Sequence, residues 1–402
     1  MGRGGGLWPS SVFARSLLVR LILAVVFSCS GYLGSGGDPE AYHMLGRYLL
    51  QRWEDPGHAD LGAIVEEAGF EELEHFYDIH VDNVERWGEW DGVGHYLNTV
   101  MPIVVVHALS YAVWDHPFSF VLVTSVVSAL AVARAVRAFG LSTREARWLV
   151  WNPVSLYYAA THFKESFSES LVLMFLAALF AGGSAVRAFP WVCAMGLFRV
   201  SFAGLFGLVA LMRLSVVGRM HPGVFGLGML GLFLVLPAFN GSEVVPETGR
   251  VFSLVYGSAF GSKVLAPLVG LLLPLPCQFL FAWGSMDLWS VFSSVYGAFY
   301  YWVCAGLWRR RGVVLRDAEL RRWCNSALGV SLVMGYLFLG GPGVKDRYFS
   351  GFFPLLLLAW IFARRGNGDR GGNSVADAGF GRSRGVGHER HVGRPGYARR
   401  VW

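Results

Sequence analysis

The chain is poor in charged residues, which make up 15% of its 402 positions. Soluble domains carry about 25% charged residues, so the composition excludes an ordinary soluble domain. The formal net charge of +6 comes mostly from arginines that flank apolar runs. An excess of this origin does not indicate a nucleic-acid partner, and we expect none.

Cysteine is also scarce. The chain has five cysteines, and none of them shows the paired spacing of a metal centre. We therefore expect them to pack as small apolar side chains within helices. These residues are Cys29, Cys193, Cys277, Cys304 and Cys324.

The chain is rich in long hydrophobic runs. Hydrophobic residues make up 54% of the chain and aromatic residues 15%. Several runs reach about 17–25 residues, the length that crosses a bilayer core of roughly 30 Å. Because backbone in lipid must satisfy its own hydrogen bonds, the spans should be α-helices. We predict an all-α fold, a polytopic transmembrane helical bundle of about 8–11 spans.

The distribution of charge predicts the orientation and four segments. Arg3, Arg15 and Arg20 precede or open the first apolar run, which places the N-terminus in the cytoplasm. The next segment carries fifteen acidic residues against three arginines and is then external. The segments are a cytoplasmic N-terminus with the first span (1–34), an external acidic loop (35–98), a transmembrane helical bundle (99–363) and a disordered, basic cytoplasmic tail (364–402).

The segment 97–114 decides the topology because it is barely long enough to cross. If it lies in the membrane interface, the run 117–138 crosses inward, and the four arginines near its end become cytoplasmic, as the charge rule requires. A span over 147–163 then runs outward. That span would deliver Lys164 and Glu165 to the external face.

This topology brings four sets of polar residues to the external face. One comes from the run 190–214, which we expect to break near Arg199. A lipid phosphate leaving group needs positive charge, and an acceptor hydroxyl needs a carboxylate base. The four sets are Asp38, Glu40, Tyr42 and His43; Lys164, Glu165 and Glu169; Arg199; and Lys345, Asp346, Arg347 and Tyr348.

Four stretches resemble, in order and spacing, the polytopic GT-C type glycosyltransferases that use polyprenyl-phosphate sugars. They are "GGDPEAYHMLGRYL", "GVGHYLNTVMPIVVVHALSYAVWDHP", "ARWLVWNPVSLYYAATHFKESFSES" and "KDRYFSGFFPLLLLAW". The third is similar to stretches of the GPI mannosyltransferases and of bacterial relatives. The chain departs from the oligosaccharyltransferase branch because it lacks a clear Asp-x-Asp pair and a large C-terminal soluble domain.

The resemblance implies roles for these residues. Asp38 would be the catalytic base or a metal-linked carboxylate, with Mg²⁺ or Mn²⁺ as the cofactor, and Glu165 the second catalytic carboxylate. The lipid phosphate would be bound by Lys164, Arg199, Lys345, Arg347 and Tyr348, with Glu40, His43, Glu169 and Asp346 in the same cavity. The expected partners are a polyprenyl-phosphate-linked sugar, a glycan, lipid or protein acceptor, and membrane lipids. We expect a multi-pass integral membrane protein of the bacterial plasma membrane, in preference to the endoplasmic reticulum, with both termini in the cytoplasm.

Each feature has an alternative interpretation. Asp38 could simply cap a helix that begins at Pro39, and Lys164 with Glu165 could anchor the end of a span at the interface. At the level of the whole chain, the alternatives are a polysaccharide polymerase or ligase and a lipid-linked sugar transporter or flippase.

Overall fold

The computed structural model describes residues 8–30, 32, 37–59, 63–64, 100–181, 185–198, 200–240, 288–337 and 351–365. Within these ranges every regular element is a helix, which confirms the prediction of an all-α fold. Most of the predicted acidic loop and nearly all of the predicted tail lie outside the described residues.

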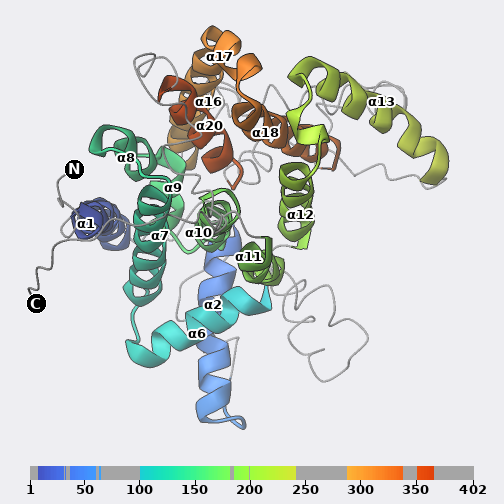
Figure 1. Cartoon of the computed structure of the whole chain (residues 1–402). Helices are drawn as coiled ribbons and strands as arrows, with labels where there is room; N and C mark the ends of the chain where they lie inside the picture. The colour runs from blue at the N-terminus through green and yellow to red at the C-terminus, as the bar shows by residue number, and fades with distance from the viewer. Residues whose placement is uncertain are drawn as a thin grey trace, which may run out of the picture.

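The helices pack around a central group of short segments, α9 and α10 (Figure 1). In chain order they are α1 (Trp8–Cys29), α2 (Gly37–Glu54), α6 (Met101–Val113), α7 (Phe118–Ala138), α8 (Thr143–Val150), α9 (Pro153–Ala159), α10 (Glu165–Leu176) continued by a π-helical turn (Ala177–Ala181), α11 (Ala185–Phe198), α12 (Val200–Leu214), a 3-10 turn (Val217–Arg219), α13 (Pro222–Asn240), α16 (Leu288–Arg309), α17 (Arg311–Arg316), α18 (Ala318–Leu337) and α20 (Phe353–Arg365).

Two helical segments within the described residues, Ser11–Cys29 and Phe118–Ala138, are long and apolar enough to span a membrane. The first presents apolar side chains outward, since Leu18 and Ile22 are 58% and 57% exposed, while Arg20 on its inner side is fully buried. On this helix, apolar side chains face outward and a charged side chain faces inward, which is the reverse of a helix in a soluble protein and suits lipid.

The predicted number of spans is not established by these helices. The other apolar helices that the structure describes are shorter, namely Met101–Val113, Ala185–Phe198, Phe202–Arg213 and Pro222–Leu232. A helix of 13 residues such as α6 is about 20 Å long and cannot cross a bilayer core by itself. The predicted break in the run 190–214 is present, between α11 and α12.

The predicted span over 147–163 is wrong. This stretch forms two short helices, α8 and α9, followed by a non-helical segment over 160–164. Asn152 precedes the first residue of α9, Pro153, and adopts an extended conformation (φ −61°, ψ 113°). A proline disfavours helical geometry in the residue before it, so the helix stops and restarts at this point.

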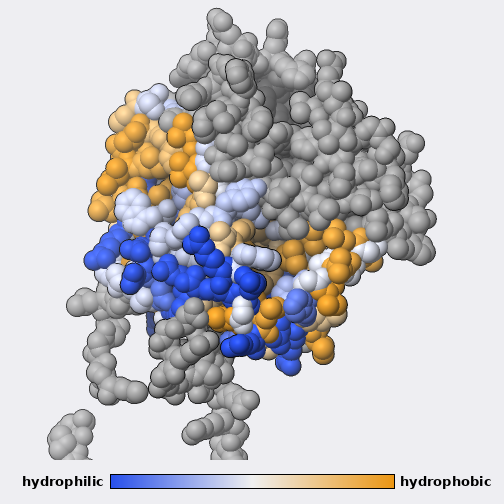
Figure 2. Space-filling view, turned by 90° about the horizontal axis from the view of Figure 1, so that it is seen from above, coloured by the Kyte–Doolittle hydropathy of each residue, from blue (hydrophilic) through white to orange (hydrophobic). Residues whose placement is uncertain are grey.

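One end of the bundle collects arginines. Arg365, where α20 ends, donates to the carbonyl oxygens of Phe139 and Gly140, where α7 ends, at 3.3 and 2.8 Å. Arg15 of α1 and Arg147 of α8 line one pocket at the same end. We call this region the basic end, and it includes Arg15, Arg137, Arg144, Arg147, Arg310, Arg364 and Arg365. Figure 2 shows hydrophilic residues gathered between hydrophobic flanks in a view from above Figure 1.

The opposite end is covered by α2 and α6, which pack on each other below α7 and α10 in Figure 1. The hydroxyls of Tyr32 and Tyr157 lie 2.7 Å apart there. Phe27, near the end of α1, meets Phe292, near the start of α16, with ring centroids 6.1 Å apart. Because α16 then reaches Trp360 of α20 at Gly306, it runs from this end toward the basic end.

Glu145 ties the basic end together. Its carboxylate accepts hydrogen bonds from Arg365 Nε and Nη2, each at 2.7 Å, and from the Ser142 hydroxyl and backbone N–H in a capping box. Burial raises the pKa of Glu145, but the hydrogen bonds from Arg365 and Ser142 outweigh it and lower the pKa from 4.5 to about 2. The end of α20 is therefore held to the start of α8 by an ionised carboxylate.

We predict that Glu145→Gln lowers the free energy of unfolding by about 1 kcal/mol at neutral pH, because it removes charge-assisted hydrogen bonds from a partly exposed group. A carboxyl whose pKa is lowered on folding adds stability that is complete above its unfolded pKa and lost below its folded one. The difference from wild type should thus shrink between pH 4.5 and about 2. Unfolding in detergent micelles across this range measures it, with the exposed Glu54 changed to Gln as the control; a pH-independent difference contradicts the assignment.

Candidate functional site

The stretch "THFKESFSES", residues 161–170, lies inside the bundle. Every residue in it is buried: Lys164 is 7% exposed and Glu165 1%. Both residues are therefore enclosed by protein and do not lie on its surface, whereas their predicted location toward the external side stays a prediction. They are enclosed because α9 is too short to carry the chain out, and the segment that follows turns back into α10 within the protein.

Hydroxyl groups of α7 hold this turn in place. The Thr124 and Ser125 hydroxyls both donate to the carbonyl oxygen of Ala159, the last residue of α9, at 2.9 and 3.0 Å. The Thr161 hydroxyl donates to the carbonyl oxygen of Tyr157 at 3.0 Å. These bonds satisfy carbonyl groups that a helix end leaves without intrahelical partners, and they fix the position of the next residues.

The first turns of α2 reach this buried turn. Lys164 Nζ lies 5.8 Å from the centre of the Tyr42 ring, within the range of a cation–π interaction. His43 lies beside His162, with ring centroids 5.6 Å apart. Two of the four predicted polar sets, the one that contains His43 and the one that contains Lys164, therefore meet in space.

Two further histidines and a tyrosine complete this part of the site. His107 Nε2 and His162 Nδ1 lie 3.2 Å apart, and His107 stacks on Phe120 with ring centroids 3.5 Å apart. His43 Nδ1 forms a short hydrogen bond with the Tyr111 hydroxyl. The sequence-based reasoning missed His107, Tyr111 and His162, although His162 lies inside the charged stretch and His107 interrupts an otherwise apolar run.

A buried ionic network lies behind the turn. Arg20 donates hydrogen bonds to the hydroxyls of Ser16, Ser128 and Ser155, at 2.6, 2.9 and 2.9 Å. Glu169 interacts electrostatically with Arg20 and accepts a hydrogen bond from Ser155. The expectation that Arg20 opens the first span as a cytoplasmic charge is therefore wrong, because it is fully buried within α1.

Some polar atoms around this turn have unused hydrogen-bonding capacity. Asn152 Nδ2 donates to Glu169 Oε1 at 2.9 Å, but Asn152 Oδ1 and the hydroxyl oxygen of Ser166 are buried without a partner among the described residues. Buried polar atoms are normally hydrogen-bonded. The two atoms are therefore available to a water molecule or a ligand.

The remaining predicted site residues are placed less completely. Asp38 and Glu40 belong to the first turn of α2. Asp38 precedes Tyr42 by about one turn of helix and Glu40 by about half a turn, but the side chains of both lie outside what the structure describes. Arg199 and the set Lys345, Asp346, Arg347 and Tyr348 also lie outside the described residues. The described part of the chain contains no group of three metal-ligating side chains that could hold a metal ion.

Comparisons with protein-family models, with curated proteins and with solved structures find no match to this chain. The chemistry of the site must therefore be inferred from its residues. It joins a buried ammonium group, two carboxyl groups and three imidazoles at the end of the bundle that is covered by α2 and α6. This set can hold an anion and exchange protons with a bound hydroxyl.

The closure of α2 over the site depends on Gly46. A methyl group at this position would overlap the Cβ atom of His107 on α6 and come within 3.3 Å of the Ala108 nitrogen. The backbones of two packed helices can move apart only slightly to make room for this methyl group. We therefore predict that Gly46→Ala lowers the free energy of unfolding by about 1–3 kcal/mol. In contrast, Gly228→Ala on α13, where a methyl group meets nothing within 4 Å, should be neutral or stabilising. Equal effects in detergent unfolding measurements contradict the close approach.

The ionic network makes a second prediction. Arg20→Met should lower the free energy of unfolding by about 3–5 kcal/mol, since it removes the guanidinium from three buried hydroxyls and from the field of Glu169. Glu169→Gln should lower it by about 1–3 kcal/mol, since the amide keeps an oxygen for Asn152 but changes a buried hydrogen-bonding group. The double variant should lose at least about 1 kcal/mol less than the sum of the two. Combining Arg20→Met with Glu54→Gln is the control and should be additive. Additivity of the Arg20 and Glu169 changes would show that they act separately.

Proposed function

We propose that this protein is a polytopic membrane glycosyltransferase of the GT-C type, which moves a sugar from a polyprenyl phosphate to an acceptor hydroxyl. The observation that carries the proposal is the burial of Lys164 and Glu165, with Lys164 against Tyr42 of α2. Charged side chains inside an apolar bundle are costly and usually functional. Their meeting with the first turns of α2 is the juxtaposition that a two-carboxylate site with Asp38 and Glu165 requires.

The roles follow from the chemistry of the groups. Lys164 supplies a positive charge for the phosphate, which must carry away negative charge when the bond from the sugar to the phosphate oxygen breaks. Asp38 or Glu165 accepts the proton of the acceptor hydroxyl as the new bond forms. Arg199, Lys345, Arg347 and Tyr348 would add phosphate contacts, and a divalent cation would be held through Asp38.

The position of the site supports an external location. Phe120, which lies against His162 with ring centroids 5.2 Å apart, is the third residue of α7, whereas the basic end meets the last residues of that helix. At 21 residues, α7 is about 30 Å long. Because basic residues favour the cytoplasmic side, the site lies toward the external side in this proposal, and both termini are cytoplasmic.

One observation favours a second candidate, a transporter or flippase for a lipid-linked sugar. The Arg20–Glu169 network and the three histidines form a buried set of titratable groups, and such sets also serve as proton relays in transporters. A transporter moves its substrate without changing it. Product formation therefore separates the two candidates.

We predict that the purified full-length protein in liposomes transfers labelled sugar from a polyprenyl-phosphate donor. Glu165→Gln and Asp38→Asn should each reduce the rate by about 100-fold or more, since each removes a carboxylate from the reacting groups. Lys164→Gln should reduce it comparably. Glu54→Gln, an exposed carboxylate further along α2, should retain the wild-type rate.

The outcome separates the two candidates only if donor flux is measured in the same liposomes. Flux of an unmodified donor without any product would contradict the glycosyltransferase and support the transporter. Full transfer activity in the Glu165→Gln and Asp38→Asn proteins would contradict the assigned site.

A further inference from the structure

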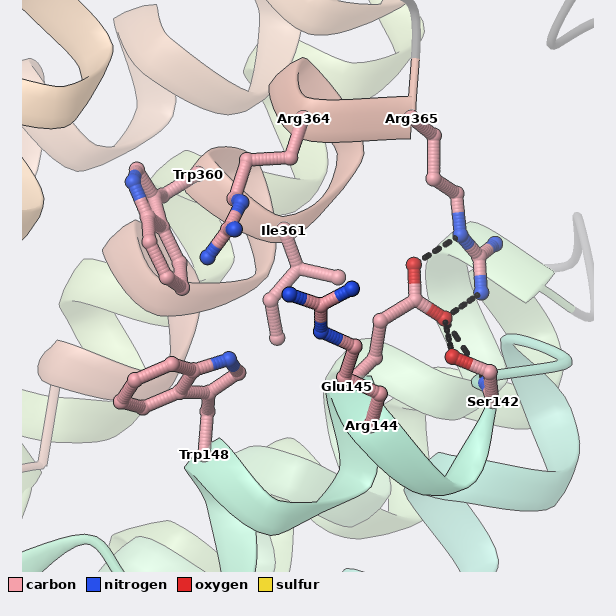
Figure 3. A pocket seen from close by; sticks show the side chains of 8 residues that line it. All are labelled: Ser142, Arg144, Glu145, Trp148, Trp360, Ile361, Arg364 and Arg365. Carbon is pink, nitrogen blue, oxygen red and sulfur yellow. Dashed lines mark hydrogen bonds and ion pairs between the residues drawn. The ribbon is translucent and has the colours of Figure 1, made fainter. Parts of the chain in front are cut away.

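A second polar site lies at the basic end, far from the buried turn. A pocket of about 190 Å³ opens there between α8 and α20 (Figure 3). This is far more than the 10–15 Å³ that one water needs. Its lining residues are Ser142, Arg144, Glu145, Trp148, Trp360, Ile361, Arg364 and Arg365.

The charge inside the pocket is unbalanced. Figure 3 shows the guanidinium groups of Arg144 and Arg364 reaching into the space between the two indoles and Glu145. Glu145 is the one carboxylate among the lining residues, and it is already engaged by Arg365 through two hydrogen bonds of 2.7 Å. The pocket is thus lined by three guanidinium groups and one carboxylate, which leaves an excess of positive charge.

Neighbouring arginines strengthen the positive field. Burial and then the charges of Arg310, Arg144 and Arg147 lower the pKa of Arg364, and the opposing effect of Glu145 does not compensate for them. The chain therefore holds several guanidinium groups close together although they repel one another. An anion placed between them would relieve that repulsion, and the planar guanidinium fork matches the oxygens of a phosphate.

Tryptophans form the other wall of the pocket. The ring centroids of Trp148 and Trp360 lie 5.4 Å apart, and Trp302 packs against both, at 4.8 and 4.6 Å. Arg364 lies over the Trp360 ring at 4.8 Å, and Trp302 remains 44% exposed. Tryptophan is enriched at the level of lipid headgroups, where one side of the ring is apolar and the other wet.

We propose that this pocket binds a phosphate group, in the first place the headgroup phosphate of an anionic phospholipid in the leaflet at the basic end. Orientation by the positive-inside rule requires arginines at this end, but it requires neither a pocket nor paired indoles. The lipid as the source of the phosphate rests on the membrane location proposed above. The phosphate chemistry itself depends on Arg144, Arg364 and the tryptophans.

The test is thermal unfolding of the full-length protein in a neutral detergent. Phosphatidylglycerol, phosphatidylcholine, inorganic phosphate and inorganic sulfate are titrated separately. We expect phosphatidylglycerol to raise the Tm in a saturable manner and phosphatidylcholine to have no such effect. The double variant Arg144→Gln/Arg364→Gln should weaken half-saturation by about tenfold or more, as the loss of charge-assisted hydrogen bonds predicts. Arg137→Gln/Arg316→Gln, which removes two exposed arginines outside the lining, should leave it unchanged.

The arms distinguish the sources of phosphate. Saturable stabilisation by inorganic phosphate, lost in the Arg144/Arg364 variant and absent with sulfate, would support the pocket with a soluble phosphate as its ligand. Equal weakening in both double variants would overturn the proposal, because it would show a diffuse surface charge. A Tm that none of the additives changes would also overturn it. The measured Tm does not depend on sugar transfer, so this test can fail or succeed independently of the catalytic proposal.

Discussion

The structure depends on one constraint: charged side chains that lie among apolar helices must be satisfied inside the protein. Arg20 is fully buried in α1, and its hydrogen bonds to hydroxyls of α1, α7 and α9 tie the first helix to two distant parts of the chain. Glu169 extends the same network to α10. Because unpaired buried charge is far more costly than a lost apolar contact, this network fixes the arrangement of the helices around α9 and α10.

The same constraint explains the form of the buried turn. Residues 160–164 are not helical, and non-helical backbone inside an apolar bundle survives only where it is enclosed by protein. The hydroxyls of Thr124 and Ser125 on α7 donate hydrogen bonds to the carbonyl oxygen of Ala159, the residue from which this segment starts. The serine and threonine of this otherwise apolar helix therefore stabilise the turn by hydrogen bonding. By satisfying the carbonyl groups of the turn, they hold Lys164 beside Tyr42 of α2.

The sequence predicts the parts of this molecule that depend on local chemistry. Apolar length predicts helices, and the meeting of His43 with the 161–170 stretch agrees with the predicted convergence, but the restart of the helix at Pro153 was not predicted. Depth and partners could not be predicted, since they depend on packing between distant segments. Arg20 looks like a flanking charge until Ser128 and Ser155 are placed around it, and His107 looks like a packing residue until His162 is placed beside it.

The two ends of the bundle differ in the charged groups that they contain, and this difference bears on function. At the basic end, Glu145 is saturated by Arg365 and Ser142, and the neighbouring arginines remain an excess of one sign. At the end that α2 covers, an ammonium group, carboxyl groups and imidazoles are mixed and buried together. A one-signed excess can bind an anion but has no group that readily takes a proton, because arginine stays protonated. The mixed set has acids and bases in contact, so if the protein carries out a group transfer, the chemistry belongs beside Lys164 and the basic end serves to hold a charged ligand.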